Sequence, residues 1–176
     1  HNKEKQNNIQ AVLGKHYHRG QWRFQTNLYN QQLQYAGALT KAQAEADRRQ
    51  VEPGAENNFM HDKQGDAHFY WQQYIGDHWS SHNDIDYRLF RAHGNLFGAY
   101  TQSRDVLTLN QKFQGIYERS NFLVGANVVH DKYHLESSAG IDNERQTLLS
   151  VYSHLKHKFT TSLSSVSGAR VAYLDN

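Results

Sequence analysis

The sequence predicts an all-β chain, an antiparallel transmembrane β-barrel of which about eight strands are present. Three observations support this fold class. Apolar and polar residues alternate along most of the chain, which is the period of a β-strand. The second side of these runs is polar, and each run is about ten residues long, enough for a tilted strand to cross a bilayer. Short and long connections alternate, as they do in outer-membrane barrels.

Each expected strand is supported by apolar residues spaced two apart. In chain order the apolar sides comprise Trp22, Phe24 and Leu28; Phe69, Trp71 and Ile75; Ile85, Tyr87 and Leu89; Leu107, Leu109 and Phe113; Phe122, Val124 and Val128; and Leu149, Val151 and Leu155. A weaker run comes first, and Val171 and Tyr173 begin a last one. The expected strands are 9–18, 21–31, 68–76, 84–91, 106–118, 121–130 and 147–158, with an eighth from 171 onwards.

The lengths of the connections alternate along the chain. A soluble meander has no reason to sort long loops to one end, whereas an outer-membrane barrel has short turns on one side and longer loops on the other. The expected connections are a tight turn at 18–21, a long segment at 35–67, a short link at 77–82, a loop at 92–105, a tight turn at 119–120, a loop at 132–146 and a short link at 159–162.

One short helix is expected inside the long segment. Thr40 and Gln43 fit a capping box, in which the threonine side chain caps the helix and the glutamine side chain reaches back. The alanines and the glutamate at 42–46 favour helix. We expect the helix to end near Arg49, ahead of Pro53.

Composition excludes several classes of protein. No run approaches the roughly 18 apolar residues of a membrane helix, and the absence of cysteine excludes a disulfide framework. Aromatic residues make up 12% of the chain and there is one proline, which argues against disorder. The net charge of +2 gives no nucleic-acid footprint. Motifs of phosphate-binding loops, dinucleotide sites and nucleophile elbows are absent, so we expect no enzyme.

The hydrophobic fraction of 38% is low for a soluble core, but it fits a chain whose apolar residues face lipid. Charges of both signs then fall on the polar side of neighbouring strands. We interpret them as cross-strand ion pairs that line a polar lumen, with contact to a plug domain or to a passing substrate as the alternative. The residues expected to face the lumen are Arg23, Asp84, Asp86, Arg88, Lys112 and Lys156.

Aromatic residues concentrate towards the ends of the expected strands, as in the aromatic belts at the two membrane interfaces. Stacking of these rings on a sugar is the alternative. The residues concerned are Tyr70, Trp71, Tyr74, Trp79, Tyr87, Tyr100, Tyr117 and Tyr133.

Five residues are candidates for ligand binding. Arg48 and Arg49 close the expected helix, where two guanidinium groups suit a citrate or catecholate anion; complementing the helix dipole is the structural alternative. His61, His130 and His134 each lie beside or near an aspartate, a combination that suits a first-row metal arriving at an outer loop. Polar surface residues are the alternative for all three, and the spacing identifies no particular metal.

The stretch from Gly37 to Gln50, GALTKAQAEADRRQ, resembles a segment of TonB-dependent outer-membrane receptors, especially the ferric-citrate and siderophore branch. The runs 109–117 and 122–127 are similar to mid-barrel strands of that family. Such receptors resemble a 22-stranded barrel preceded by a plug domain, and nothing in 1–176 looks like the plug or the last barrel strand. The resemblance therefore implies that residues 1–176 form a middle part of the barrel.

The resemblance also implies a function in the bacterial outer membrane. The expected activity is energy-coupled import of a ferric chelate, a siderophore or ferric citrate, with no covalently bound cofactor. The implied partners are the TonB complex, reached through a plug domain outside this chain, the metal chelate, outer-membrane lipid and lipopolysaccharide. Three alternatives remain: a zinc, copper or haem receptor of the same family, a passive porin-like barrel, and a soluble β-sandwich that binds a ligand.

Overall fold

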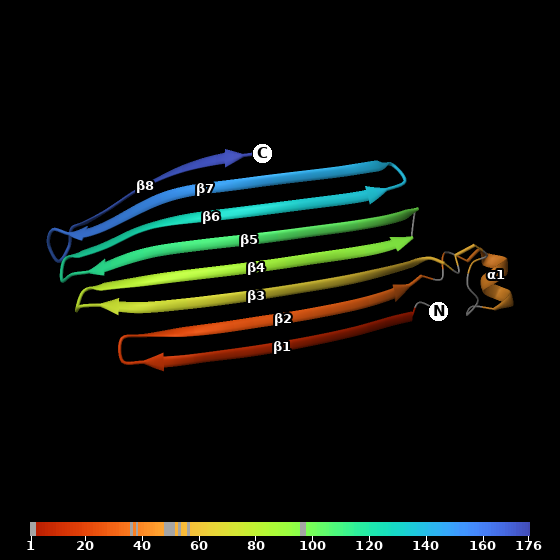
Figure 1. Cartoon of the computed structure of the whole chain (residues 1–176), viewed down its shortest axis with the longest axis horizontal. Coiled ribbons are helices and arrows are strands. Elements are labelled where there is room, and N and C mark those ends of the chain that lie inside the picture. The colour runs from red at the N-terminus through yellow and green to blue at the C-terminus, as the bar shows by residue number, and fades with distance from the viewer. Residues whose placement is uncertain are drawn as a thin grey trace.

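A computed structural model describes residues 3–35, 37, 39–47, 52, 54–55, 57–95 and 98–176. Eight antiparallel strands form one sheet, in which each strand pairs with the next one along the chain (Figure 1). The all-β class and the expected number of strands are thereby confirmed. The strands are β1 (Lys3–Tyr17), β2 (Gly20–Gln34), β3 (Phe59–Ile75), β4 (Trp79–Asn95), β5 (Ala99–Ile116), β6 (Ser120–Ser137), β7 (Gly140–Lys158) and β8 (Ser164–Asp175).

The sheet has two open edges, formed by β1 and β8. Four connections, β1–β2, β3–β4, β5–β6 and β7–β8, lie at one end of the sheet, which we call the turn end (Figure 1). The opposite end is called the α1 end, because α1 (Lys41–Ala46) lies there, within the connection of β2 to β3.

The expected alternation of short and long connections is wrong. β4 continues to Asn95 and β5 begins at Ala99, and β6 and β7 are joined between Ser137 and Gly140. Most of the expected loops at 92–105 and 132–146 is therefore strand, and β3 begins well before residue 68. The hydrogen bonds between strands are made by the main chain. Strand pairing can therefore continue beyond the last residue of each alternating apolar run.

The register aligns the apolar sides of all eight strands. Residues that lie directly opposite one another point to the same side of a sheet. One row runs across the whole sheet through such pairs and contains only apolar side chains. Its members, from β1 to β8, are Leu13, Phe24, Phe69, Ile85, Leu109, Val128, Leu149 and Tyr173.

We call the side of the sheet that holds this row the apolar face, and the other side the polar face. Within the described ranges, only Ala55 and Ala92 are buried apolar residues. The apolar face itself stays uncovered: Leu28 is 53% exposed and Val151 54%. The described chain thus forms one layer, and its apolar residues do not make a central core.

Two glycines make room for aromatic rings on the two faces. A Cβ at Gly115 would lie 2.9 Å from the ring of Trp79, and one at Gly125 would lie 2.5 Å from the hydroxyl of Tyr152. The Tyr152 hydroxyl reaches across Gly125 and donates a hydrogen bond to Asn110 Oδ1 at 3.0 Å. Glycine is required here by close packing between neighbouring strands.

The capping box of α1 is confirmed. Gln43 N donates to Thr40 Oγ1 at 3.4 Å, and Thr40 N donates to Gln43 Oε1 at 2.8 Å. The helix ends at Ala46, earlier than expected, because Asp47 already has extended backbone. No helix in the described part of the chain has the length and apolar character needed to cross a membrane.

Candidate functional site: the polar face of β2 to β5

The residues expected to face a lumen share one face of the sheet. In each case the apolar neighbours along the strand point to the opposite side, as the register requires. All six lie on the polar face: Arg23, Asp84, Asp86, Arg88, Lys112 and Lys156.

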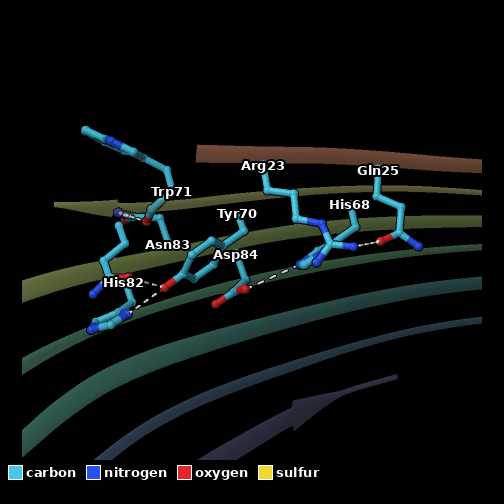
Figure 2. Close-up of polar contacts among 9 residues, drawn as sticks. Arg23, Gln25, His68, Tyr70, Trp71, His82, Asn83 and Asp84 are labelled. Carbon is cyan, nitrogen blue, oxygen red and sulfur yellow. Dashed lines mark hydrogen bonds and ion pairs between the residues drawn. The ribbon is translucent and has the colours of Figure 1, made fainter. Parts of the chain in front are cut away.

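A chain of hydrogen bonds crosses the polar face from β2 to β4. Gln21 Nε2 donates to Gln72 Oε1 at 2.8 Å, and the Tyr70 hydroxyl donates to the same oxygen at 2.9 Å. The Tyr70 oxygen also lies 3.1 Å from His82 Nδ1 (Figure 2). His82 Nε2 lies 2.9 Å from Ser80 Oγ.

These contacts fix the tautomer of His82. Because the one proton of the Tyr70 hydroxyl is donated to Gln72, the Tyr70 oxygen accepts from Nδ1–H of His82. His82 Nε2 then carries no proton and accepts the Ser80 hydroxyl. Ser80 is only 7% exposed, so a substrate has little access to its oxygen. We interpret the chain of bonds as a rigid lining, because satisfied polar networks hold side chains in one arrangement.

A second group of polar contacts lies nearer the middle of the same strands. His68 Nε2 and Asp84 Oδ1 are 3.3 Å apart across β3 and β4, and Figure 2 shows both on the same side of the sheet as Tyr70, with the ring of Trp71 on the other side. Arg23 donates to Gln25 Oε1 at 2.9 Å along its own strand. The result is a surface that offers cationic, anionic and neutral polar groups side by side.

The expected ladder of cross-strand ion pairs is formed only in part. Arg88 Nε donates to Asp86 Oδ1 at 2.7 Å, but the two residues belong to the same strand. One cross-strand pair on the polar face lies near the α1 end and joins Arg104 of β5 to Asp131 of β6, with Nε 3.0 Å from Oδ1. Sequence reasoning missed this pair because it placed both residues at or beyond the ends of the expected strands.

The apolar face also has an ion pair near the α1 end. Arg91 Nη2 donates to both carboxylate oxygens of Asp105, at 2.8 and 2.7 Å, and the Tyr87 hydroxyl donates to Oδ1 at 2.8 Å. One guanidinium nitrogen is thus shared between the two carboxylate oxygens, in charge-assisted hydrogen bonds that hold the two groups together. Arg91 and Asp105 continue the alternation of the apolar residues on their strands. Extending both expected strands by this alternation would have placed the two residues on the same face.

The candidate ligand residues do not converge. Arg48 and Arg49 lie outside the described residues. The three histidines lie within strands and on the apolar face, so the expected placement of His61 and His134 in connections is wrong, whereas His130 lies in a strand as expected. His61 Nε2 is 2.6 Å from Asn30 Oδ1, and the ring centroids of His61 and His93 are 4.9 Å apart.

The other two histidines pair with neighbours on β7. His130 Nδ1 is 2.9 Å from Thr147 Oγ1, and His134 Nδ1 is 2.6 Å from Asn143 Oδ1. Across the part of the chain that the structure describes, no three histidine or acidic side chains are grouped so that they could hold a metal ion.

A cavity of about 800 Å³ opens beside His61 at the α1 end. Its wall contains Lys3 and Lys5 of β1, Phe59 of β3 and His93 of β4. The cavity lies mainly on the side of the sheet opposite the polar hydrogen-bond chain, because most of its strand residues belong to the apolar face; Leu33 and Met60 are the exceptions. It therefore does not join the polar groups of β2 to β4 into one pocket.

Comparison with protein-family models and with curated proteins finds no match for this chain. The function is therefore inferred from the difference between the two faces of the sheet.

Proposed function

We propose that the chain forms part of the wall of an outer-membrane transporter, with its apolar face against lipid and its polar face lining an aqueous interior. The observation that supports this most is the row of eight apolar residues, one from each strand, opposite a face of charged and amide side chains. Membrane barrels require this arrangement, because lipid covers the outside and water fills the inside.

The height of the apolar face supports the same proposal. On β4 the residues of the apolar face from Trp79 to Leu89, which include the polar Ser81 and Asn83, span about eleven positions. At about 3.4 Å per residue and a tilt of about 45°, such a stretch rises about 25 Å, the height of the apolar band of an outer-membrane barrel.

Aromatic residues at the turn end of the apolar face add a second line of support. All three tryptophans of the chain, Trp22, Trp71 and Trp79, lie there. Trp71 Nε1 donates to the Tyr17 hydroxyl at 2.7 Å, and Trp79 Nε1 donates to the Tyr117 hydroxyl at 2.9 Å. Rings with one polar atom are favoured where hydrocarbon meets the headgroups.

The β-sandwich alternative is less well supported. In a sandwich the inner face of each sheet is covered by a second sheet about 10 Å away. The described residues contain no second layer, and large apolar side chains such as Leu13 (62% exposed) and Val171 (77%) lack any cover from them.

The transported substrate follows from the resemblance of 37–50 to TonB-dependent receptors. We infer that it is a ferric chelate, a siderophore or ferric citrate, drawn through the barrel by energy coupled from the inner membrane. The polar face supports passage of such a ligand, since Arg23, His68 and Lys112 offer donors to its oxygens beside the carboxylate of Asp84. A porin with the same wall would pass small solutes without energy.

Uptake measurements separate the two forms of transport. Cells that carry the intact gene, and cells that lack it, are given radiolabelled iron as ferric citrate and as a siderophore complex. We expect uptake of one chelate to need the gene and to stop when the proton gradient is dissipated. Uptake that needs the gene but continues without the gradient would favour the porin, and uptake of both chelates without the gene would contradict the import function.

A further inference from the structure

The cavity at the α1 end extends across the ends of β1 to β4. Two neighbouring rows of the register supply most of its wall, and the residues of each row point to the side of the apolar face. The first row comprises Lys5, Gln32, His61 and His93, and the second row comprises Lys3, Gln34 and Phe59. The volume of about 800 Å³ lies within the range of small-molecule binding sites.

The β1 side of the cavity is positively charged. Lys3 and Lys5 are exposed and form no ion pair with another described residue. Glu4 lies between them in the sequence, but it points to the polar face, where its Oε1 accepts a hydrogen bond from Gln31 Nε2 at 2.8 Å. None of the described residues in the cavity wall is acidic. The two lysines are therefore available to an anionic group of a ligand.

The side of the cavity formed by β3 and β4 is aromatic. The ring centroids of Phe59 and His93 are 5.7 Å apart with an angle of 72° between the planes, and those of His61 and His93 are 4.9 Å apart at 65°. Phe59 is 40% exposed, so part of its ring surface can still meet another ring. Pairs of aromatic rings are stabilised beyond the area that they bury. This side of the cavity therefore suits a flat, apolar part of a ligand.

The order of the strands separates the charged side from the aromatic side. The lysines lie on β1 and Phe59 lies on β3, two strand spacings away, which is roughly 10 Å at about 4.8 Å per spacing. Gln32 and Gln34 of β2 lie between them. A ligand that contacts both sides needs an acidic group at one end and a flat apolar body at the other.

We propose that this cavity binds an aromatic carboxylic acid that carries no metal. The carboxylate lies against Lys3 and Lys5, where hydrogen bonds from charged donors hold it, and the ring lies against Phe59 and His93. The inference does not rest on the proposed function, because binding at this cavity requires neither a membrane nor transport.

The test measures binding to the full chain, purified in a neutral detergent, by equilibrium dialysis with the same detergent in both chambers. The main probe is 2-naphthoate. Three further probes each lack one of its features: 2-naphthamide lacks the charge, decalin-2-carboxylate lacks the aromatic rings, and citrate lacks the apolar body.

Four variants remove or keep the groups that the proposal uses. K3Q/K5Q removes the charge of the β1 side, K3R/K5R keeps it, and F59L replaces the aromatic ring with an apolar side chain. K15Q/K158Q removes two lysines at the turn end and is the matched control, since Lys15 lies on the same strand and the same face as Lys3 and Lys5.

We expect the wild-type chain to bind 2-naphthoate at least about tenfold more tightly than 2-naphthamide, the factor that a hydrogen bond to a charged group contributes. K3Q/K5Q should lose this advantage. F59L should bind 2-naphthoate about threefold more weakly, as the wild type should bind decalin-2-carboxylate. K3R/K5R and K15Q/K158Q should match the wild type. Equal binding of 2-naphthamide or citrate, no loss in K3Q/K5Q or in F59L, or an equal loss in K15Q/K158Q would overturn the proposal.

The result is separate from that of the proposed function. A chain whose apolar face meets lipid but which does not bind 2-naphthoate contradicts the cavity site alone. A chain that binds 2-naphthoate through Lys3, Lys5 and Phe59 supports the site even where the uptake measurements contradict import.

Discussion

At the scale of single residues, alternation along a strand sets the face to which a side chain points, and the register between strands sets which side chains it can contact. The period of two placed Arg23, Asp84 and Lys112 on one face, and the register agrees. It did not predict that Arg88 pairs along its own strand, or that Tyr70 orients His82. Direction depends only on the parity of the residue number within a strand, whereas a partner depends on the register between two strands.

The fit between Trp79 and Gly115 can be tested by a double-mutant cycle. A methyl group at position 115 would meet the Trp79 ring at 2.9–3.0 Å, so Gly115→Ala should lower the free energy of unfolding by about 1–3 kcal/mol. In the Trp79→Leu background the clash is removed, and the same change should cost much less. Both values come from denaturant unfolding in detergent. Equal costs in the two backgrounds would show that the ring does not set the requirement for glycine.

At the scale of elements, apolar periodicity located every strand but did not predict where the strands end at the α1 end. β6 continues to Ser137 through a stretch that contains His130, Lys132 and His134, and these polar residues gave no signal of burial. The sheet continues in this region, where side chains pair between neighbouring strands, as Arg104 does with Asp131 and Arg91 with Asp105. His134 was expected in a loop because polar side chains usually mark loops, although a ladder of main-chain bonds does not depend on them.

The start of the short helix α1, unlike the ends of the strands, was predicted from the sequence, because the capping residues Thr40 and Gln43 identify it. Replacing Thr40 with alanine removes one cap, a change that costs a helix about 0.5–2 kcal/mol, so hydrogen exchange at the amides of Ala44 and Asp47 should speed up. No residue of α1 is buried, so the unfolding temperature of the sheet should stay the same. Lys41→Ala is the control, since Lys41 and Glu45 form only an exposed contact at 4.0 Å. A fall in sheet stability would show that α1 packs on the strands.

At the scale of the whole molecule, the low hydrophobic fraction of 38% is explained by a single sheet with one apolar face. The sequence alone predicted that the apolar sides exist, but the register was needed to show that they join into one surface across eight strands. A shift of one residue in any pairing would have broken that surface.

An arginine placed on either face should show which face meets lipid. Leu109 and Thr108 are neighbours on β5 that point to opposite sides, and Thr108 lies opposite Asp86. Leu109→Arg should destabilise the inserted protein by about 2–4 kcal/mol, the cost of arginine near the bilayer midplane, whereas Thr108→Arg should have little effect. The yield of folded protein after refolding into vesicles measures both. A larger loss for Thr108→Arg would reverse the assignment of the faces.

The accessibility of spin labels shows directly whether the apolar face meets lipid and the polar face meets water. The chain has no cysteine, so single cysteines can be introduced and labelled one at a time. The paired sites are Phe24 with Gln25, Leu109 with Thr108, and Val128 with Asn127. In vesicles we predict that labels at Phe24, Leu109 and Val128 respond to lipid-soluble oxygen and that their partners respond to a water-soluble nickel chelate. Equal response of both members of each pair to the nickel chelate would contradict the claim.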